Sequence, residues 1–387
     1  EGMADHIRRA MQESDGDMLL YAPVAGKDEF INAIGYLIRR LDENTAPENF
    51  LRHAPGLRVG SPAWESLKHG FAAACHLQES VQTTPNRIQN RNSEHFSPTI
   101  STYSRPAFIN EADTDWSLAA NRDWALGIVG RWRKEPGYQP EIIPVIVDGM
   151  ALTENRQQAE VFDPSQKGVL AARHALATKE DARLALSVAA ADADGWRALS
   201  VHKRHAILAQ VAMEIRKNRG DLIGAAAADT GKVFAEADAE VSEAVDFAEF
   251  YPYSAALLDA RPNLRVQGKG VCLVIAPWNF PIAIPCGGIA AALAAGNTVI
   301  FKPASDAVLT GWMLCQCFWR AGVSQKTLQF VPGSGPEIGP TLTASPLVDS
   351  IILTGGTDTG LRILKHSPPV YLAAETGGKN ATIVTDM

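Results

Sequence analysis

Residues 271–281 read Val-Cys-Leu-Val-Ile-Ala-Pro-Trp-Asn-Phe-Pro, an apolar strand that ends at once in a loop held by two prolines. Further short apolar runs, separated by helical stretches, follow at Thr298–Phe301, Leu328–Val331, Ile351–Thr354 and Ala381–Val384. Strands that alternate with helices predict βαβ units, and hence a parallel sheet covered on both faces. The fold class is therefore α/β.

Polar side chains stand at the ends of these strands, where open parallel sheets bind their ligands. Asn279, in the loop that begins at Pro277, could donate its side-chain amide to a developing oxyanion. Lys302 ends the second strand, in the run Phe-Lys-Pro-Ala-Ser that closes at Ser305, and could bind ribose hydroxyls or a phosphate. Taken singly, Asn279 could equally cap a turn and Lys302 could be an ordinary solvated lysine.

Two glycine-rich loops and a glutamate complete the set. The loop from Gly333 and the run Thr-Gly-Gly-Thr-Asp-Thr-Gly at 354–360 each join a strand to a helix. There, glycine lets the backbone approach a phosphate and the helix offers free N–H groups. Neither loop has the common Gly-x-Gly-x-x-Gly spacing, so each could be only a tight connection. In Ala-Glu-Thr-Gly-Gly-Lys-Asn at 374–380, Glu375 could be a general base or a surface carboxylate.

The order of these four motifs resembles the aldehyde dehydrogenase superfamily over residues 111–387. The resemblance implies a Rossmann-like NAD-binding domain, a separate catalytic domain and a hairpin that mediates oligomers. It implies that Asn279 is the oxyanion donor and Glu375 the general base. The NAD-binding residues that it implies are Pro277, Trp278, Lys302, Ser305, Gly333, Gly355, Gly356, Thr357 and Gly360.

Two positions depart from the family pattern. Ser305 stands where the family often has a glutamate that also holds the ribose, and Gly356 stands where it often has serine, although Thr357 could supply a hydroxyl. A neutral residue at 305 repels a 2′-phosphate less than a carboxylate does, so the choice between NAD and NADP stays open.

The first 53 residues carry a second resemblance. Apolar residues recur at helical spacing from Phe30 to Leu41, and the adjacent Arg39 and Arg40 could clamp a carboxylate or only mark an exposed basic face. Leu-Tyr-Ala-Pro-Val at 20–24 and Tyr-Leu-Ile-Arg-Arg-Leu-Asp-Glu-Asn at 36–44 resemble the end of a proline dehydrogenase barrel. This resemblance implies that Tyr36, Arg39 and Arg40 bind proline and that Glu43 lies near FAD.

Changes in composition and periodicity along the sequence predict three regions: 1–53 is the end of the barrel, 54–110 is a linker, and 111–387 is the aldehyde dehydrogenase part. The linker is rich in polar residues and proline, with a short helix about Ala63–Leu77. An alternating run at Ile142–Val147 ends in Asp-Gly, which predicts a hairpin. Apolar stripes predict helices about Ile207–Ile215 and Val241–Ala248. A lone barrel segment would expose its apolar stripe.

Aldehyde dehydrogenases need a nucleophilic cysteine. The family context for it is Gly-Gln-x-Cys, and none of the five cysteines, Cys75, Cys272, Cys286, Cys315 and Cys317, stands in that context. We therefore expect an internal piece of a longer polypeptide, unable by itself to oxidise an aldehyde. Cys315 and Cys317 fit core packing better than a metal site, and no metal is expected.

The composition of the chain limits the kinds of binding partner that we expect. With 36 basic and 43 acidic residues the net charge is −7, which argues against nucleic acid. No apolar run reaches the roughly 18 residues of a spanning helix, and few cysteines fit a cytoplasmic location. The expected partners are the small molecules proline and glutamate semialdehyde and, by resemblance, further copies of the chain.

A chain that carries both patterns in this order resembles the bifunctional proline utilization A family. Such an enzyme oxidises proline to pyrroline-5-carboxylate with FAD, and then glutamate semialdehyde to glutamate with NAD. Two alternatives stay open. One is an aldehyde dehydrogenase for another substrate, with a coincidental match at 1–53; the other is a catalytically dead nucleotide-binding or oligomerisation module.

Overall fold

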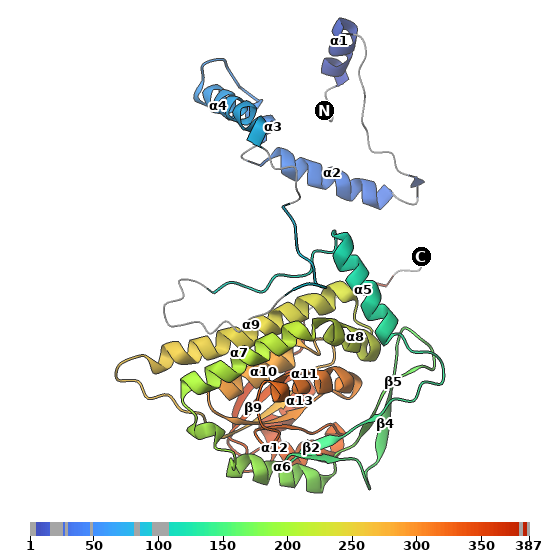
Figure 1. Ribbon diagram of the computed structural model, residues 1–387, viewed down its shortest axis with the longest axis vertical. Coiled ribbons are helices and arrows are strands. Elements are labelled where there is room, and N and C mark those ends of the chain that lie inside the picture. The colour runs from blue at the N-terminus through green and yellow to red at the C-terminus, as the bar shows by residue number, and fades with distance from the viewer. Residues whose placement is uncertain are drawn as a thin grey trace. The chain divides into compact units, whose positions relative to one another are not determined.

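The computed structural model describes residues 5–15, 26–27, 30–46, 49–80, 86–94, 108–378 and 382–384, apart from the side chains of residues 5–8, 15, 32, 40–44, 51 and 79. The chain divides into two compact units, residues 1–86 and 87–387 (Figure 1). The three-region division at residues 53 and 110 stays a prediction.

The described part of the first unit consists of helices joined by turns and irregular segments. Its elements are α1 (Asp5–Asp15), α2 (Phe30–Asn44), α3 (Phe50–His53), α4 (Pro62–Leu77) and the 3₁₀ turn η2 (Gln78–Ser80). α4 starts with a proline, and the Ser61 hydroxyl accepts from the Trp64 N–H, so the sequence itself fixes this start. On α2 the apolar stripe is exposed, as expected, with Ile31 at 81%. The strand-like run at 18–23 lies outside the described residues.

A seven-stranded sheet organises the second unit, in the order β10-β9-β6-β7-β8-β2-β3. Its parallel strands are β6 (Val271–Ile275), β7 (Thr298–Lys302), β8 (Leu328–Phe330), β9 (Ser350–Gly355) and β10 (Tyr371–Thr376). Four of the five predicted strands match these within a residue or two. The predicted Rossmann-like parallel sheet is therefore confirmed.

The fifth predicted strand is wrong. Residues 382–384 form no strand, Ala381 lies outside the described residues, and the edge of the sheet is formed by β10 instead. The run Thr-Ile-Val at 382–384 is more β-branched than β10, which contains two alanines and a glutamate, so local propensity favoured the wrong segment. Glu375 therefore lies within a strand, not in a loop that follows one.

The run at 142–147 serves two sheets. β1 (Ile142–Ile143) pairs in parallel with β5 (Leu170–Ala175), which also pairs with β4 (Gln158–Phe162) in a three-stranded sheet. Past Pro144, β2 (Val145–Val147) joins the large sheet and pairs with β3 (Met150–Leu152). Asp148 and Gly149 between them have φ of 55° and 75°, the backbone that a two-residue hairpin turn needs. The predicted hairpin is confirmed.

Helices cover both faces of the large sheet, as Figure 1 shows. The helices of the second unit are α5 (Ala119–Trp132), α6 (Lys179–Ala191), α7 (Val201–Lys217), α8 (Arg219–Thr230), α9 (Phe234–Asp259), α10 (Ala283–Ala294), α11 (Val308–Arg320), α12 (Gly335–Thr343) and α13 (Thr357–His366), with 3₁₀ turns η3 (Trp196–Ala198) and η4 (Ser305–Ala307). Cys272 and Val274 of β6 pack in a core with α7, α9, α10 and α11. The alternate Val271 and Leu273 pack in a second core with α6, α12 and α13. This alternation is what a strand buried on both faces requires.

Two segments ahead of α5, residues 87–94 and 108–115, belong to the second unit, and we call them the N-terminal strap. The Arg91 guanidinium donates to the Thr114 hydroxyl, the Ala112 carbonyl and Glu94. Asp238 of α9 accepts from both the N–H and the hydroxyl of Thr114, at 2.6 and 2.7 Å. The strap is therefore fixed to the helices by charged and polar groups.

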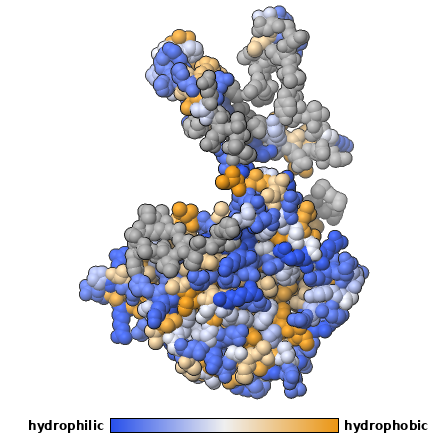
Figure 2. Space-filling model, in the orientation of Figure 1, coloured by the Kyte–Doolittle hydropathy of each residue, from blue (hydrophilic) through white to orange (hydrophobic). Residues whose placement is uncertain are grey.

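Within the part of the chain that the structure describes, no helix is both long and apolar enough to cross a membrane. The same residues bring together no group of three potential metal-ligating side chains. On the face seen in Figure 2, apolar side chains of the second unit are scattered among polar ones.

Candidate functional site

The register of the large sheet brings the predicted motifs to one edge. Ile275, at the end of β6, lies opposite Lys302 of β7 and Leu353 of β9. Glu375 of β10 lies opposite Thr354 of β9. Four neighbouring strands, β10, β9, β6 and β7, therefore end at the same edge of the sheet. They bring to it Glu375, the glycine loop at 355–360, the Asn279 loop and Lys302, as expected for a parallel sheet.

The loop that follows β6 presents its polar side chain to solvent. Asn279 and Trp278 are exposed, whereas Pro281 is buried. The Asn279 carbonyl accepts from Lys232 Nζ at 2.7 Å, so the backbone is held while the amide side chain stays outside. An exposed, backbone-anchored amide is suited to donate to a ligand.

Lys302 is buried, and its Nζ donates to the carbonyl of Pro303 at 3.0 Å. Burial lowers the pKa of Lys302 to about 8. His174 of β5 is buried as well, with no hydrogen-bond partner for Nδ1 within the described residues. Burial first, and then the charge of Lys302, lower the pKa of His174 to about 4. Ser305 is exposed at the start of η4.

The glycines of the two loops differ in their surroundings. Among the described residues, a Cβ at Gly356, the N-cap of α13, would meet nothing within 4 Å, and no side chain caps this helix. Gly355 is nearly as open, with its nearest contact at 3.9 Å. By contrast, a Cβ at Gly360 would lie 3.2 Å from Thr376, and one at Gly333 2.7 Å from Ile338. These two glycines therefore serve close packing, whereas the open pair leaves room for a ligand.

Glu375 is exposed near the end of the edge strand. The Gly377 N–H donates to the Gly355 carbonyl at 3.4 Å, and a Cβ at Gly377 would lie 3.0 Å from the Thr357 hydroxyl. The glutamate strand and the glycine loop are thus in direct contact.

Of the residues expected to bind proline, Tyr36 is half-buried and Arg39 exposed on α2. The side chains of Arg40 and Glu43 lie outside the described ones.

Four of the five cysteines are buried. Burial raises the pKa of Cys272 to about 11 and that of Cys317 to about 12, and it raises the pKa of Cys286 and Cys315 further. A nucleophile must be a thiolate, so these four thiols are unsuited to attack a carbonyl. Cys75 is exposed on α4 of the first unit.

The sequence did not single out two charged residues that hold the Asn279 loop, Lys232 and Glu240. They form a buried ion pair. The available signal was weak: each stands a few residues from a helix start, a place where most charges are solvated.

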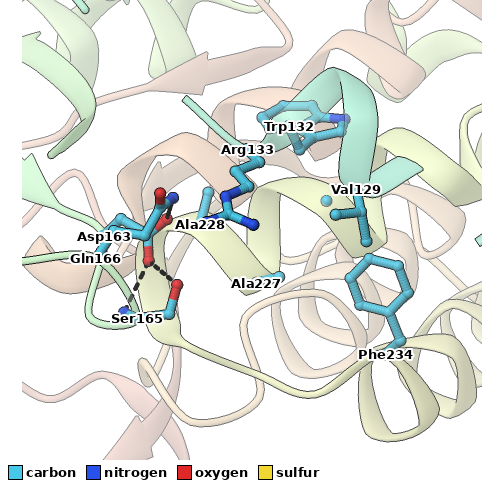
Figure 3. Close-up of a pocket in the computed structure, with 10 residues that line it drawn as sticks. Val129, Trp132, Arg133, Asp163, Ser165, Gln166, Ala227, Ala228 and Phe234 are labelled. Carbon is cyan, nitrogen blue, oxygen red and sulfur yellow. Dashed lines mark hydrogen bonds between the residues drawn. The ribbon is translucent and has the colours of Figure 1, made fainter. Parts of the chain in front are cut away.

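A cavity of about 390 Å³ lies away from the strand ends, between α5, the β4–β5 turn, α8 and the start of α9. Figure 3 shows Arg133 within it and the bonds by which Asp163 holds Ser165 and Gln166. Its other lining residues are Val129, Trp132, Gly224, Ala227, Ala228 and Phe234. None of the predicted site residues lines it.

The aldehyde dehydrogenase family model matches residues 152–387. The chain belongs to the aldehyde dehydrogenase family. A proline dehydrogenase model matches residues 1–53. The 1-pyrroline-5-carboxylate dehydrogenases of Staphylococcus haemolyticus and Bacillus cereus are 32% identical over 72% of this chain. This aldehyde dehydrogenase chain covers 57% of their length.

Solved structures are also similar to this chain. Proline utilization A from Bdellovibrio bacteriovorus is 28% identical, with a TM-score of 0.69, over 97% of this chain and 38% of that one. A 1-pyrroline-5-carboxylate dehydrogenase from Thermus, solved with bound NAD, is 30% identical with a TM-score of 0.66. That match covers 71% of this aldehyde dehydrogenase chain and 56% of the Thermus protein.

Proposed function

We propose that these residues form part of a bifunctional proline-catabolic enzyme. It would oxidise proline to pyrroline-5-carboxylate with FAD, and then glutamate semialdehyde to glutamate with NAD. The observation that carries the proposal is the order of the two family matches on one chain, proline dehydrogenase at 1–53 and aldehyde dehydrogenase at 152–387. The similarity to proline utilization A over 97% of the chain supports it.

The sheet edge fits a dinucleotide. The open space at Gly355 and Gly356 and the uncapped start of α13 would take the pyrophosphate, with Thr357 as a hydroxyl donor. Lys302 would hydrogen-bond the adenosine ribose, and Pro277, Trp278 and Ser305 would supply further contacts to NAD. NAD, when bound, accepts the hydride of the aldehyde. The choice of NAD over NADP follows the Thermus relative with bound NAD.

Two residues would act on the substrate. The exposed amide of Asn279 would donate to the carbonyl oxygen as negative charge develops there. Glu375 would take a proton from the water that releases the acid product. In the first unit, Tyr36 and Arg39 lie one helical turn apart on α2, a spacing at which both could reach the carboxylate of proline. By the resemblance to proline dehydrogenase, Arg40 would also bind proline and Glu43 would act near FAD.

Oxidation of the aldehyde also requires a cysteine thiolate as the nucleophile. The four buried thiols are unsuited to the role, and we propose that the 387 residues alone do not oxidise the aldehyde. NADH formation by this polypeptide with glutamate semialdehyde would contradict that statement.

Titration of the 387-residue chain with NAD tests the cofactor site. We expect calorimetric binding that Lys302→Met weakens by about tenfold, the equivalent of one hydrogen bond from a charged donor. The matched control is Lys179→Met, at an exposed lysine that begins α6. Equal affinities for the wild type and Lys302→Met would remove Lys302 from the site.

The native protein tests the two-step function. We expect an intact mass above 41.6 kDa and proline-dependent NADH formation that Arg39→Ala abolishes. NADH formation from aldehydes that is indifferent to Arg39→Ala, in a protein that does not oxidise proline, would indicate a general aldehyde dehydrogenase. A mass near 41.6 kDa with no NADH formation would leave only a nucleotide-binding module.

A further inference from the structure

A buried ion pair lies behind the Asn279 loop. Lys232, in the short connection between α8 and α9, and Glu240 of α9 have side chains only 9% and 2% exposed, and they contact each other. Burying two charges costs several kcal/mol per ion unless further polar contacts satisfy them. Such contacts are therefore informative about what the pair does.

In the described part of the chain, the further contacts of the pair lie on the Asn279 loop and at the start of α10. Lys232 Nζ donates to the Asn279 carbonyl at 2.7 Å and lies 3.9 Å from the centre of the Phe280 ring. The Glu240 carboxylate accepts from the N–H groups of Ile282 and Ala283, at 2.9 and 3.2 Å. One ion pair thus binds the backbone on both sides of Pro281, from the loop into the start of α10.

We propose that Lys232 and Glu240 are positioning residues that fix the backbone of Asn279, and through it the side-chain amide that the oxyanion requires. The proposal rests on the role of Asn279 in the proposed function. Asn279 itself is exposed, so close packing does not fix its side chain. Its orientation depends on the backbone, and errors of about 1 Å in such a donor cost about 100-fold in rate.

A purely structural role would have a different signature. A pair that only stabilised the fold would leave effects spread over α8, α9 and α10, and its loss would add to the loss of Asn279. A positioning pair changes the loop first, and its kinetic effect disappears once the amide is gone.

The first arm of the test uses the 387-residue chain and needs no activity. Hydrogen exchange is followed by mass spectrometry in peptides that span residues 277–284. We expect Glu240→Ala to speed exchange at Ile282 and Ala283 by about tenfold or more, since their acceptor is lost. Glu240→Gln, which keeps an acceptor oxygen, should speed it less. Glu236→Ala, at an exposed carboxylate one turn earlier on α9, should leave it unchanged.

The second arm uses the native enzyme with glutamate semialdehyde and NAD. We expect Lys232→Met to lower kcat by about 10- to 100-fold, less than the loss of an oxyanion donor itself. The Kd for NAD should change less than twofold, and Lys232→Arg should restore part of kcat. In an Asn279→Ala background the further effect of Lys232→Met should vanish. If Lys232→Met fails to fold, Lys232→Met/Glu240→Gln removes both charges together and replaces it.

The outcomes separate the two proposals. An undiminished effect of Lys232→Met on kcat in the Asn279→Ala background, or exchange that rises across all of α8–α10, overturns the positioning role. If the wild-type native protein oxidises no aldehyde, the proposed function fails. Unchanged hydrogen exchange at Ile282 and Ala283 in Glu240→Ala would, independently, show that the ion pair does not hold the backbone of the loop.

Discussion

Lys302 and His174 show how surroundings set the charge of a residue. Both side chains are buried, and burial lowers the pKa of each, to about 8 and about 4. The sequence identified Lys302 as a cation at a strand end, because strand and motif are local features. It could not show that His174, which belongs to the other sheet, shares the environment of Lys302, because that depends on long-range packing.

The first prediction concerns acid stability and His174. Its pKa is about 4 in the folded chain, and the ordinary value is 6.5, so between these two pH values the unfolded chain binds a proton that the folded chain does not. The free energy of unfolding should therefore fall as the pH drops from 6.5 to 4, with this residue contributing up to about 3 kcal/mol. Urea unfolding at several pH values should show a shallower loss for His174→Gln. His366→Gln, at an exposed histidine, should follow the wild type, whereas parallel curves for His174→Gln and the wild type would contradict the prediction.

At the scale of elements, predictability follows the strength of the local pattern. β6, β7, β8 and β9 are apolar runs between helices, and each was predicted from that pattern. β10 was missed because its residues are mostly exposed at the sheet edge, so burial does not impose an apolar sequence on it. The pairing of α5 with α8 was also invisible in the sequence, since it depends on which faces meet.

The second prediction tests that pairing with two helical glycines. A Cβ at Gly224 of α8 would lie 2.2 Å from the Trp132 ring of α5, and Trp132 is held by a hydrogen bond to Asp221. Gly224→Ala should therefore destabilise the chain by about 1–3 kcal/mol. Gly127→Ala on α5, where a Cβ would meet no atom of the described residues within 4 Å, should stabilise it by up to about 1 kcal/mol. Thermal unfolding of both variants measures this, and equal shifts would show that α5 and α8 do not pack as described.

At the scale of the whole molecule, the two units differ in how they are stabilised. Both large hydrophobic cores consist of residues between Ile143 and Ile363, within the second unit. In the first unit, α2 leaves a stripe of large apolar side chains exposed, among them Phe30, Ile31 and Ile38. The sequence already indicated this contrast, through the regular alternation in one part and a single amphipathic helix in the other.

The third prediction follows from this contrast. Residues 87–387 expressed alone should fold and unfold with a midpoint within about 2 °C of that of the second unit in the whole chain, because the buried residues of both hydrophobic cores lie in this range. The 387-residue chain should bind more of the dye ANS, through the stripe on α2. Ile31→Lys/Ile38→Lys in the whole chain should remove most of that excess. Failure of 87–387 to fold would show that the units depend on each other.

α9 has a consequence for recombining this protein with its relatives. Asp238, Ser242 and Asp246 recur every four residues and bind the N-terminal strap, while Glu240, two residues from Asp238, holds the Asn279 loop. A crossover placed at residue 115 would join a foreign strap to the native α9 and mismatch these contacts. The smallest transplantable block therefore starts at Arg87, and chimeras cut there should keep both the strap contacts and the contacts that hold the Asn279 loop.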